Sequence, residues 1–408
     1  MIDIQLLRDD PEKVKKGVTA KGHDANLVDK VLKVDEQYRK LLQEVEVLRA
    51  DKNKAAKSKD IEKGKLVKAQ LAKKEPELEA VEKEFSEALL AIPNLPADDV
   101  PEGKGEADNK ILREVGESGK KGLDHLELGQ KLDVLDFESG AKVAGSGFYY
   151  LKNEGAMLEV ALVHYGLDFL RNKGYSAMIT PDLARERFYV GTGYAPKGPE
   201  AQTYTINDSD LGLIATAEVT LAGYHADQVL KKGDLPKKYA GYSHCFRVES
   251  GGYGKYSKGL YRVHQFTKVE MYLFCLPEES EKLHQELLAL EEEFWKSLEI
   301  PYRVVEMCAG DLGAQAAKKY DLEAWMPGRG DWGEVTSTSN TTDYQARRLN
   351  IRANMGGANE YVHTLNGTLV ATSRAIIAIL ENFQQEDGTV KIPEVLQKYT
   401  SFSEIKSR

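Results

Sequence analysis

The stretch GYSHCFRVESGGYGKYSKGLYRVHQFTKVEMYLF, residues 241–274, decides the fold of this chain. It predicts two strands, 241–249 and 260–274, joined by a loop over 250–259 that holds four glycines. Strand side chains alternate between faces, so Arg247 and Glu249 are expected to share one face. The matching set on the partner strand is Arg262, His264, Phe266, Lys268 and Glu270. Such a face suits a ligand with an anionic part, a flat ring and an ammonium group; a solvated hairpin with charged cross-strand pairs is the alternative.

Composition restricts the classes of protein to which the chain can belong. Its 408 residues are enough for two or three domains, and a net charge of -9 argues against a general nucleic-acid binder. The three cysteines lie far apart without a metal-binding pair, which fits a reducing compartment and predicts no zinc site. The absence of a long apolar run or a signal peptide predicts a cytoplasmic protein with no membrane span, and a processed organellar protein is the alternative.

Residues 27–92 are expected to form an antiparallel coiled-coil arm of two helices. Apolar residues step by threes and fours from Val31 to Leu48, and again from Val67 to Ile92, with a short polar stretch between the two runs. Helices of this length predict an arm of roughly 40–45 Å. Pro76 conflicts with a continuous second helix, so either a kink or a looser tip is expected there.

The distal half of this arm is basic although the chain as a whole is acidic. Ten Lys or Arg and three acids lie between Arg49 and Lys74. A phosphate-binding finger for a structured RNA and a solvated coiled-coil face both fit this pattern. The candidate RNA-binding residues are Arg49, Lys52, Lys54, Lys57, Lys59, Lys63, Lys65 and Lys68.

A proline-rich segment, residues 92–105, indicates a domain boundary. We therefore expect an N-terminal domain over 1–105 and a second domain over 106–408. A helix over about 154–173, followed by a strand that ends at Pro181, fits either core packing or a subunit interface.

Three further segments carry candidate site residues. The first is Thr216-Ala217-Glu218, which could belong to a site but is also a short, common pattern at an ordinary strand end or helix cap. The second, WGEVTSTSN (332–340), contains Glu334 and Ser337, which as hard oxygen ligands would suit magnesium; a strand with a solvent-facing acid fits this pattern equally well. The third, residues 364–380, predicts a turn at Asn366-Gly367 and then a helix in which Arg374 needs an anionic partner.

These segments, in this order and spacing, resemble the seryl-tRNA synthetase family of class II aminoacyl-tRNA synthetases. Residues 241–274 resemble motif 2, the helix and strand ending at Pro181 resemble motif 1, and the segment with Arg374 resembles motif 3. The resemblance covers nearly the whole chain. It implies an α+β fold, in which an antiparallel sheet flanked by helices follows an N-terminal coiled-coil arm.

The resemblance also implies roles for individual residues. Arg247, Arg374 and Glu334 are the expected catalytic residues. Serine is expected to contact Thr216, Ala217, Glu218, Arg247, Glu270 and Thr368. ATP is expected to contact Arg247, Val248, Glu249, Val263, Phe266, Glu334, Val335, Thr336, Ser337 and Arg374. Magnesium is expected on Glu334 and Ser337, with no zinc.

The implied activity is formation of seryl adenylate from serine and ATP, then transfer of serine to tRNA(Ser), and to tRNA(Sec) where present, by a homodimer that meets around Pro181. The sequence departs from the family pattern at Thr368, Leu369, Thr372 and Ser373, so side chains around the expected serine pocket differ from those of the family. The alternatives are a paralogue that loads a small amino acid onto a carrier protein, an antibiotic-resistant duplicate, and a non-catalytic protein with the same fold.

Overall fold

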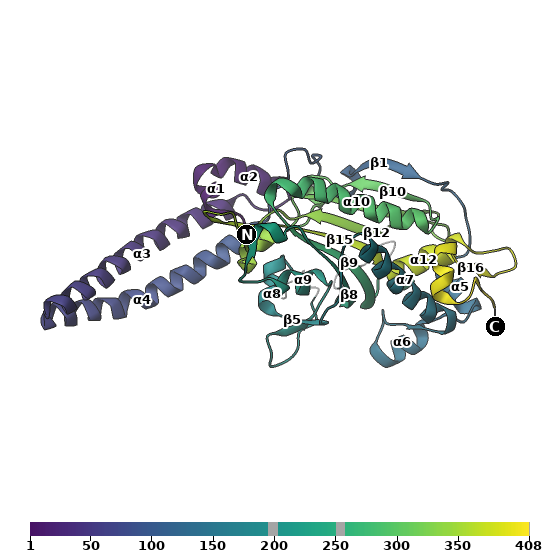
Figure 1. The fold of residues 1–408 in the computed structure, drawn as a ribbon, viewed down its shortest axis with the longest axis horizontal. Coiled ribbons are helices and arrows are strands. Elements are labelled where there is room, and N and C mark those ends of the chain that lie inside the picture. The colour runs from purple at the N-terminus through teal and green to yellow at the C-terminus, as the bar shows by residue number, and fades with distance from the viewer. Residues whose placement is uncertain (195–202, 250–257, 408) are drawn as a thin grey trace. The chain divides into compact units, whose positions relative to one another are not determined.

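The computed structural model describes residues 1–194, 203–249 and 258–407 (Figure 1). Two compact units divide the chain, residues 1–96 and 97–408. Residues 97–105 of the proline-rich segment 92–105 fall in the second unit, where the Ala97 N–H donates to the Ala317 carbonyl at 2.9 Å. Among the described residues, no helix combines the length and the apolar character that a membrane span requires.

The first unit is helical. Its helices are α1 (Ile4–Asp9), α2 (Pro11–Ala20), α3 (Asn26–Ser58) and α4 (Ile61–Leu90). Helices α3 and α4 form the expected antiparallel pair (Figure 1), closed by a turn in which Lys59 has a left-handed backbone and the Asp60 side chain caps α4. With 33 residues, α3 is about 50 Å long.

The predicted apolar seam holds the two long helices together. Leu41, Val45, Val67, Leu71 and Leu78 are buried between them, and Tyr38 stacks on Phe85 with 5.4 Å between ring centroids. Ion pairs also join the helices at mid-length, Arg49 to Glu75 at 2.9 Å and Lys74 to Glu44 at 3.0 Å. Helix α4 continues through Pro76, whose ring lies on its exposed side.

The second unit is built on a sheet of eight strands among the described residues. In spatial order they are β1 (Lys110–Val115), β10 (Tyr302–Glu306), β11 (Lys318–Met326), β12 (Asp331–Asn340), β15 (His363–Ala371), β9 (Gln265–Cys275), β8 (Lys237–Phe246) and β4 (Ser176–Ile179). Only the β4–β8 pairing among them is parallel. This confirms the predicted α+β class with an antiparallel sheet.

Helices and small sheets surround this main sheet (Figure 1). The helices are α5 (His125–Lys131), α6 (Phe137–Ala144), α7 (Asn153–Asn172), α8 (Glu186–Thr192), α9 (Glu218–Tyr224), α10 (Ser280–Ser297), α11 (Tyr344–Leu349), α12 (Thr372–Asn382) and α13 (Glu394–Thr400). The small sheets pair β2 (Leu135–Asp136) with β3 (Tyr150–Leu151), β5 (Leu183–Arg185) with β6 (Leu211–Leu213), β16 (Val390–Lys391) with β17 (Glu404–Ile405), and β13 (Arg352–Asn354) with both β7 (Val229–Lys231) and β14 (Asn359–Tyr361).

Strand β9 explains how the sheet carries both a core and a site. Its odd-numbered residues from Val269 to Cys275 enter the main core with helices α7, α10 and α12. Its even-numbered residues face the other way, as strand alternation requires. Tyr272 and Phe274 pack into a second core, and Phe266, Lys268 and Glu270 line a cavity further along the strand.

Two predictions about strand boundaries are wrong. The hairpin strands end at Phe246 and begin again at Gln265, so Arg247, Glu249, Arg262 and His264 lie outside the ladder. Residues 259–261 instead form a 3-10 turn, η3 (Gly259–Tyr261). The expected turn at Asn366-Gly367 is also absent, because both residues pair within β15, opposite Tyr272 and Met271 of β9.

Candidate active site

A cavity of about 660 Å³ opens on the face of the sheet that carries Glu270. It lies between the ends of β8 and β9, strands β12 and β15, and the first turn of α12. The predicted residues that line it are Glu218, Arg247, Glu249, Val263, Phe266, Glu270, Glu334, Val335, Thr336, Ser337, Thr368 and Arg374. Its volume is that of a site for a nucleotide-sized ligand.

One wall of the cavity carries paired charges from two elements. Arg374, in the first turn of α12, donates to the Glu334 backbone carbonyl at 2.9 Å and meets the Glu334 carboxylate at the same distance. The Tyr261 ring centroid lies 4.8 Å from the Arg374 guanidinium. Burial alone would raise the pKa of Glu334, but the charges of Arg374 and Lys319 outweigh it and lower the pKa to about 2. The carboxylate is therefore ionised at neutral pH.

A second arginine stands across the same cavity. The guanidinium of Arg247 lies 5.2 Å from the Phe266 ring centroid, a cation–π distance. Glu249, two residues along, pairs with Arg262 at 3.2 Å. These two pairs connect the segment that follows β8 to the start of β9 and to the residues just before it. The Phe266 ring and the Arg247 guanidinium both line the cavity wall.

The floor of the cavity is a compact polar group. Thr368 lies opposite Glu270 across the β15–β9 pairing, and its hydroxyl donates to the Glu270 carboxylate at 3.0 Å. The Lys268 ammonium donates to the same hydroxyl at 3.1 Å and also pairs with Glu270. All three side chains are buried, so this floor offers both a carboxylate and a hydroxyl in a low-dielectric setting.

Glu218, at the start of α9, is a second buried carboxylate on the cavity wall. Its oxygens accept hydrogen bonds from the side chains of Gln345 at 2.6 Å, Asn366 at 3.0 Å and Tyr194 at 3.1 Å. Burial, reinforced by the negative charge of Glu270, raises the pKa of Glu218 to about 7. A cationic ligand group placed here would favour the ionised carboxylate.

Three predicted contact residues do not line the cavity. Thr216 and Ala217 are buried behind it, where the Thr216 hydroxyl accepts the Glu218 backbone N–H at 3.3 Å. Val248 is half-buried between Arg247 and Glu249. His264 turns away from the cavity, stacks on Phe148 and bonds to the Tyr204 hydroxyl at 2.8 Å, so the face expected to include it is wrong at that position.

Comparison with known proteins identifies the family. Residues 1–96 match the model of the seryl-tRNA synthetase N-terminal domain, and residues 203–383 match that of the tRNA synthetase class II core domain (G, H, P, S and T). A serine–tRNA ligase of Dictyoglomus thermophilum is 51% identical over 424 aligned positions that cover 100% of both chains. The chain belongs to the seryl-tRNA synthetase family.

Other members of the seryl-tRNA synthetase family agree in sequence and in structure. A serine–tRNA ligase of Rubrobacter xylanophilus is 49% identical over 98% of this chain and 97% of its own. The crystal structure of seryl-tRNA synthetase from Pyrococcus horikoshii complexed with ATP superposes with a TM-score of 0.93, 42% identity and full coverage of both chains. The cytoplasmic serine–tRNA ligase of Naegleria fowleri in complex with AMP gives 0.88 and 35%, covering 100% of this chain and 99% of that one. The predicted class II fold is thereby confirmed.

The oxygen ligands expected for magnesium in this seryl-tRNA synthetase fold face the cavity. Glu334 and Ser337 both line it, and Asp321 lies opposite Ser337 across the β11–β12 pairing. The Asp321 Oδ1 atom is buried without a hydrogen-bond partner. No group of three or more His, Cys, Asp or Glu side chains suited to a metal occurs in residues 1–194, 203–249 and 258–407. The donor set therefore fits a hard cation that takes its remaining ligands from a bound triphosphate or from water.

Several lining or supporting residues had no predicted ligand contact, although Lys268 was predicted to lie on the same strand face as Glu270. Tyr194, Lys268 and Asn366 line the cavity, and Gln345 supports Glu218 from behind. Lys268 stands at the same strand parity as Glu270, so alternation along β9 already pointed to it. Tyr194 has no role among the sequence-based expectations, and the residues that follow it, Ala195 and Pro196, lie outside the described residues. Gln345 has no local signal, because 127 residues separate it from Glu218.

Proposed function

We propose that this chain is a serine–tRNA ligase, which forms seryl adenylate from L-serine and ATP and then transfers serine to tRNA(Ser). One observation carries the proposal: Arg247, Glu334 and Arg374 face the same cavity as Glu218, Glu270 and Thr368. An anion-binding wall thus lies beside a polar floor that offers carboxylates and a hydroxyl to a small hydroxyl amino acid. Transfer to tRNA(Sec), where it exists, follows from the same chemistry.

In the first step a carboxylate oxygen of serine attacks the α-phosphorus of ATP, and pyrophosphate leaves. Negative charge grows on the phosphoryl oxygens, and Arg247 and Arg374 stabilise it by fixed electrostatics rather than by proton transfer. Phe266 stacks on the adenine and Glu249 accepts its amino group, while Val263 closes the base pocket. Val335 and Thr336 complete the ATP contacts from the cavity wall. Val248, which does not line the cavity, supports Arg247 and Glu249 on either side of it.

Magnesium would be held by Glu334 and Ser337 beside the triphosphate. When bound, it supplies positive charge that offsets the charge on the phosphate oxygens. Arg374 contacts the Glu334 carboxylate and the Glu334 backbone carbonyl, each at 2.9 Å, and so orients this candidate ligand.

Serine is recognised as a polar ligand. Glu218, supported by Thr216 and Ala217, takes the ammonium group, and Glu270 and Thr368 bond the hydroxyl. A site built to bond a hydroxyl leaves buried polar atoms unpaired when alanine enters, so alanine is strongly rejected. Threonine keeps the hydroxyl and adds a methyl group, so its rejection depends on the space around Thr368. We expect threonine to be rejected less strongly than alanine.

The second step uses a nucleic acid. The terminal ribose hydroxyl of tRNA attacks the seryl carbonyl and releases AMP. We assign tRNA binding to the N-terminal domain, residues 1–105, and catalysis to residues 106–408. The basic residues of the arm, which spans about 27–92, supply phosphate contacts: Arg49, Lys52, Lys54, Lys57, Lys59, Lys63, Lys65 and Lys68, all of them exposed.

A homodimer is the proposed assembly, and the cytoplasm is the proposed location. Helix α7 and strand β4 expose Met157, Val160 and Ile179, which are 47%, 59% and 80% accessible. Val160 and Ile179 line a groove of about 650 Å³ whose described lining is mostly apolar and aromatic, with one carboxylate, Glu159, and two imidazoles, His164 and His244. An exposed apolar surface of this kind supports a subunit interface around Pro181.

Serine-dependent exchange of labelled pyrophosphate into ATP tests the first step. Each proteinogenic amino acid is assayed in turn, and serine is expected to give the fastest exchange. Arg247→Ala should lower serine-dependent exchange by roughly a hundredfold or more, because one charge contact to the transition state is lost. Exchange at a near-wild-type rate would contradict the role of Arg247, and exchange with another amino acid would contradict the proposed substrate.

The exchange assay, combined with acylation of tRNA or of a carrier protein and with inhibitor resistance, separates the main alternatives. A carrier-protein paralogue would support exchange but would acylate a phosphopantetheine carrier rather than tRNA. A protein with no catalytic role would show no exchange with any amino acid. An antibiotic-resistant duplicate would charge tRNA with serine while resisting a serine-mimicking inhibitor.

A further inference from the structure

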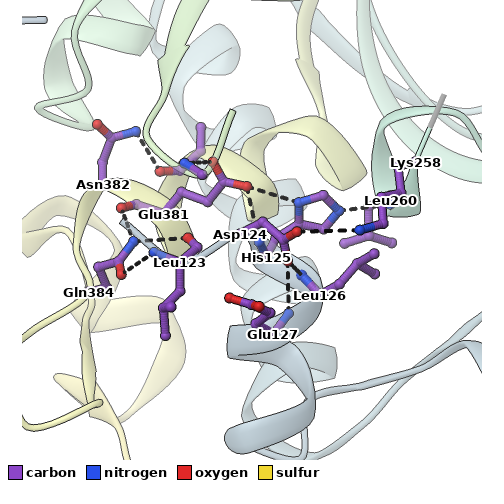
Figure 2. A network of polar contacts seen from close by, with 12 residues as sticks. Leu123, Asp124, His125, Leu126, Glu127, Lys258, Leu260, Glu381, Asn382 and Gln384 are labelled. Atoms are coloured by element: carbon purple, nitrogen blue, oxygen red, sulfur yellow. Dashed lines mark hydrogen bonds and ion pairs between the residues drawn. The ribbon is translucent and has the colours of Figure 1, made fainter. Parts of the chain in front are cut away.

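A buried carboxylate near the end of helix α12 organises a network outside the cavity (Figure 2). The Glu381 side chain is 2% exposed and accepts three N–H groups. They are the His125 backbone N–H at 3.0 Å, the His125 ring Nδ1 at 2.9 Å and the Gly328 backbone N–H at 2.9 Å. Three donors on one carboxylate hold the His125 ring in a single orientation.

The other ring nitrogen of His125 faces the chain that leads into β9. The backbone N–H of Leu260 donates to His125 Nε2 at 3.2 Å (Figure 2). Nδ1 therefore donates to the carboxylate while Nε2 accepts the Leu260 N–H. The ring is thus an adaptor that joins the carboxylate of one element to the backbone N–H of another.

The fit around Nε2 leaves no room for a larger residue before Leu260. Gly259 has φ +66°, and a Cβ atom added to it would lie 2.2 Å from His125 Nε2. Glycine is required here both by its backbone conformation and by its contact with the ring. Close approach of turn η3 to His125 is therefore built into the fold.

Turn η3 in turn reaches the cavity. Tyr261 follows Leu260, and its ring centroid lies 4.8 Å from the guanidinium of Arg374. Arg374 and Glu381 belong to the same helix, seven residues and about two turns apart. The contacts therefore form a closed loop: Glu381 holds His125, His125 holds Leu260, Tyr261 contacts Arg374, and α12 connects Arg374 back to Glu381.

We propose that His125 is a positioning residue for the adenylate-forming reaction: it fixes turn η3 against α12, so that Tyr261 holds Arg374 in the orientation that binds the phosphates of ATP. This inference rests on the proposed function. His125 does not line the cavity and touches no reacting group. Its effect should therefore be on ATP and not on serine, because serine is expected at Glu218, Glu270 and Thr368.

Two substitutions separate the halves of the adaptor. His125→Asn keeps an N–H near the position of Nδ1, so the bond to Glu381 survives, but it has no acceptor for Leu260. His125→Gln carries an oxygen that reaches the position of Nε2, so the acceptor for Leu260 survives. In serine-dependent pyrophosphate exchange, His125→Asn should raise the KM for ATP roughly five- to tenfold, the cost of about one hydrogen bond. The KM for serine should stay within about twofold, and His125→Gln should lie closer to the wild type.

Tyr261→Leu, which removes the ring beside Arg374, provides the matched control for the path. If His125 acts through Tyr261, the double variant His125→Asn/Tyr261→Leu should show a smaller change in ATP KM than the sum of the two single changes. Additive changes would overturn the path through Tyr261. A lowered Tm with an unchanged KM for ATP in His125→Asn would overturn the positioning role and leave His125 as structural only.

These outcomes are distinct from failure of the proposed function. A wild-type chain that catalyses no serine-dependent exchange would remove the activity itself. A wild-type chain that exchanges normally, with KM values for ATP in both His125 variants equal to its own, would remove only the role of His125.

Discussion

Glu218 combines burial with three hydrogen bonds, and its protonation should control stability. Its pKa rises from 4.5 to about 7 on folding, chiefly because burial disfavours the charge. Between these pH values the folded state holds one proton more than the unfolded state. The free energy of unfolding must therefore fall as pH rises through this window. Stability from this group is complete below pH 4.5 and is lost above pH 7.

The isosteric change Glu218→Gln isolates this contribution. Glutamine keeps an oxygen for Gln345 and Asn366, and its amide can donate to the Tyr194 hydroxyl, but it does not titrate. As pH rises from 4.5 to above 7, the wild type should lose on the order of 3 kcal/mol of unfolding free energy relative to the variant. Urea unfolding at a series of pH values measures it, and a difference that does not change with pH would contradict the raised pKa.

At the same scale, sequence reasoning found residues with local signals and missed those without. Phe266, Lys268 and Glu270 share a face because β9 alternates, which a sequence reader can see directly. Asn366-Gly367 resembled a turn because this dipeptide favours one. In the fold Gly367 is a strand residue, and a Cβ atom there would lie 2.8 Å from the buried carboxylate of Glu291. Glycine is needed at this position because Glu291 of α10 packs directly against it, and this contact leaves no signal in the local sequence.

Among the elements, helix α4 tolerates a proline that should weaken it. Pro76 cannot donate to the Ala72 carbonyl one turn earlier, and it lies on the exposed side where water can serve that carbonyl instead. The seam residues Leu71 and Leu78 are buried on either side of it. Packing between the two helices therefore outweighs the local loss, and the helix stays continuous.

Pro76→Ala should restore the missing hydrogen bond and stabilise the arm by roughly 1–3 kcal/mol. Amide hydrogen exchange of residues 72–80 in the full-length chain should slow by the corresponding factor. Glu79→Ala, a change on the exposed side of the same helix, is the control and should alter exchange little. Unchanged amide exchange in Pro76→Ala would contradict the prediction, because it would show that Pro76 does not limit the local opening of residues 72–80.

The elements also show where sequence-based boundaries fail. The two long helices and α7 were placed within a few residues, because long apolar periods are averaged over many turns. The strands of the motif 2 hairpin were drawn too long at the ends that meet the loop. Residues 259–264 leave the ladder because His125 and Gly147 hold their backbone N–H groups instead, at Leu260 and His264. Those partners lie more than a hundred residues away in the sequence.

For the whole molecule, the proposed roles of the two units, tRNA binding by the first and adenylate formation by the second, lead to a direct prediction. Adenylate formation needs only the cavity of the second unit, whereas tRNA charging should need the arm as well. Deleting residues 33–85 should therefore leave serine-dependent pyrophosphate exchange within about twofold and abolish charging. Unchanged charging would remove the arm from the reaction.

A finer deletion separates the length of the arm from its charge. The ion pairs Arg49–Glu75 and Lys74–Glu44 hold the helices together at mid-length, so residues 52–72 can be replaced by a short glycine-containing turn without opening the base. This variant loses Lys52, Lys54, Lys57, Lys59, Lys63, Lys65 and Lys68 together with roughly 15 Å of arm. The control keeps the full arm and changes the same seven lysines to glutamine.

If the lysines act through phosphate charge, the glutamine control should lower kcat/KM for tRNA and flatten its salt dependence, because each lost phosphate contact removes about one unit from the slope of log affinity against log salt. If the shape of the arm matters as well, the shortened arm should lose more activity than the control at every salt concentration. Equal losses would assign the whole effect to charge. A glutamine control with wild-type salt dependence would show that the basic face of the arm is only solvated, and tRNA binding would then have to be sought elsewhere in the chain.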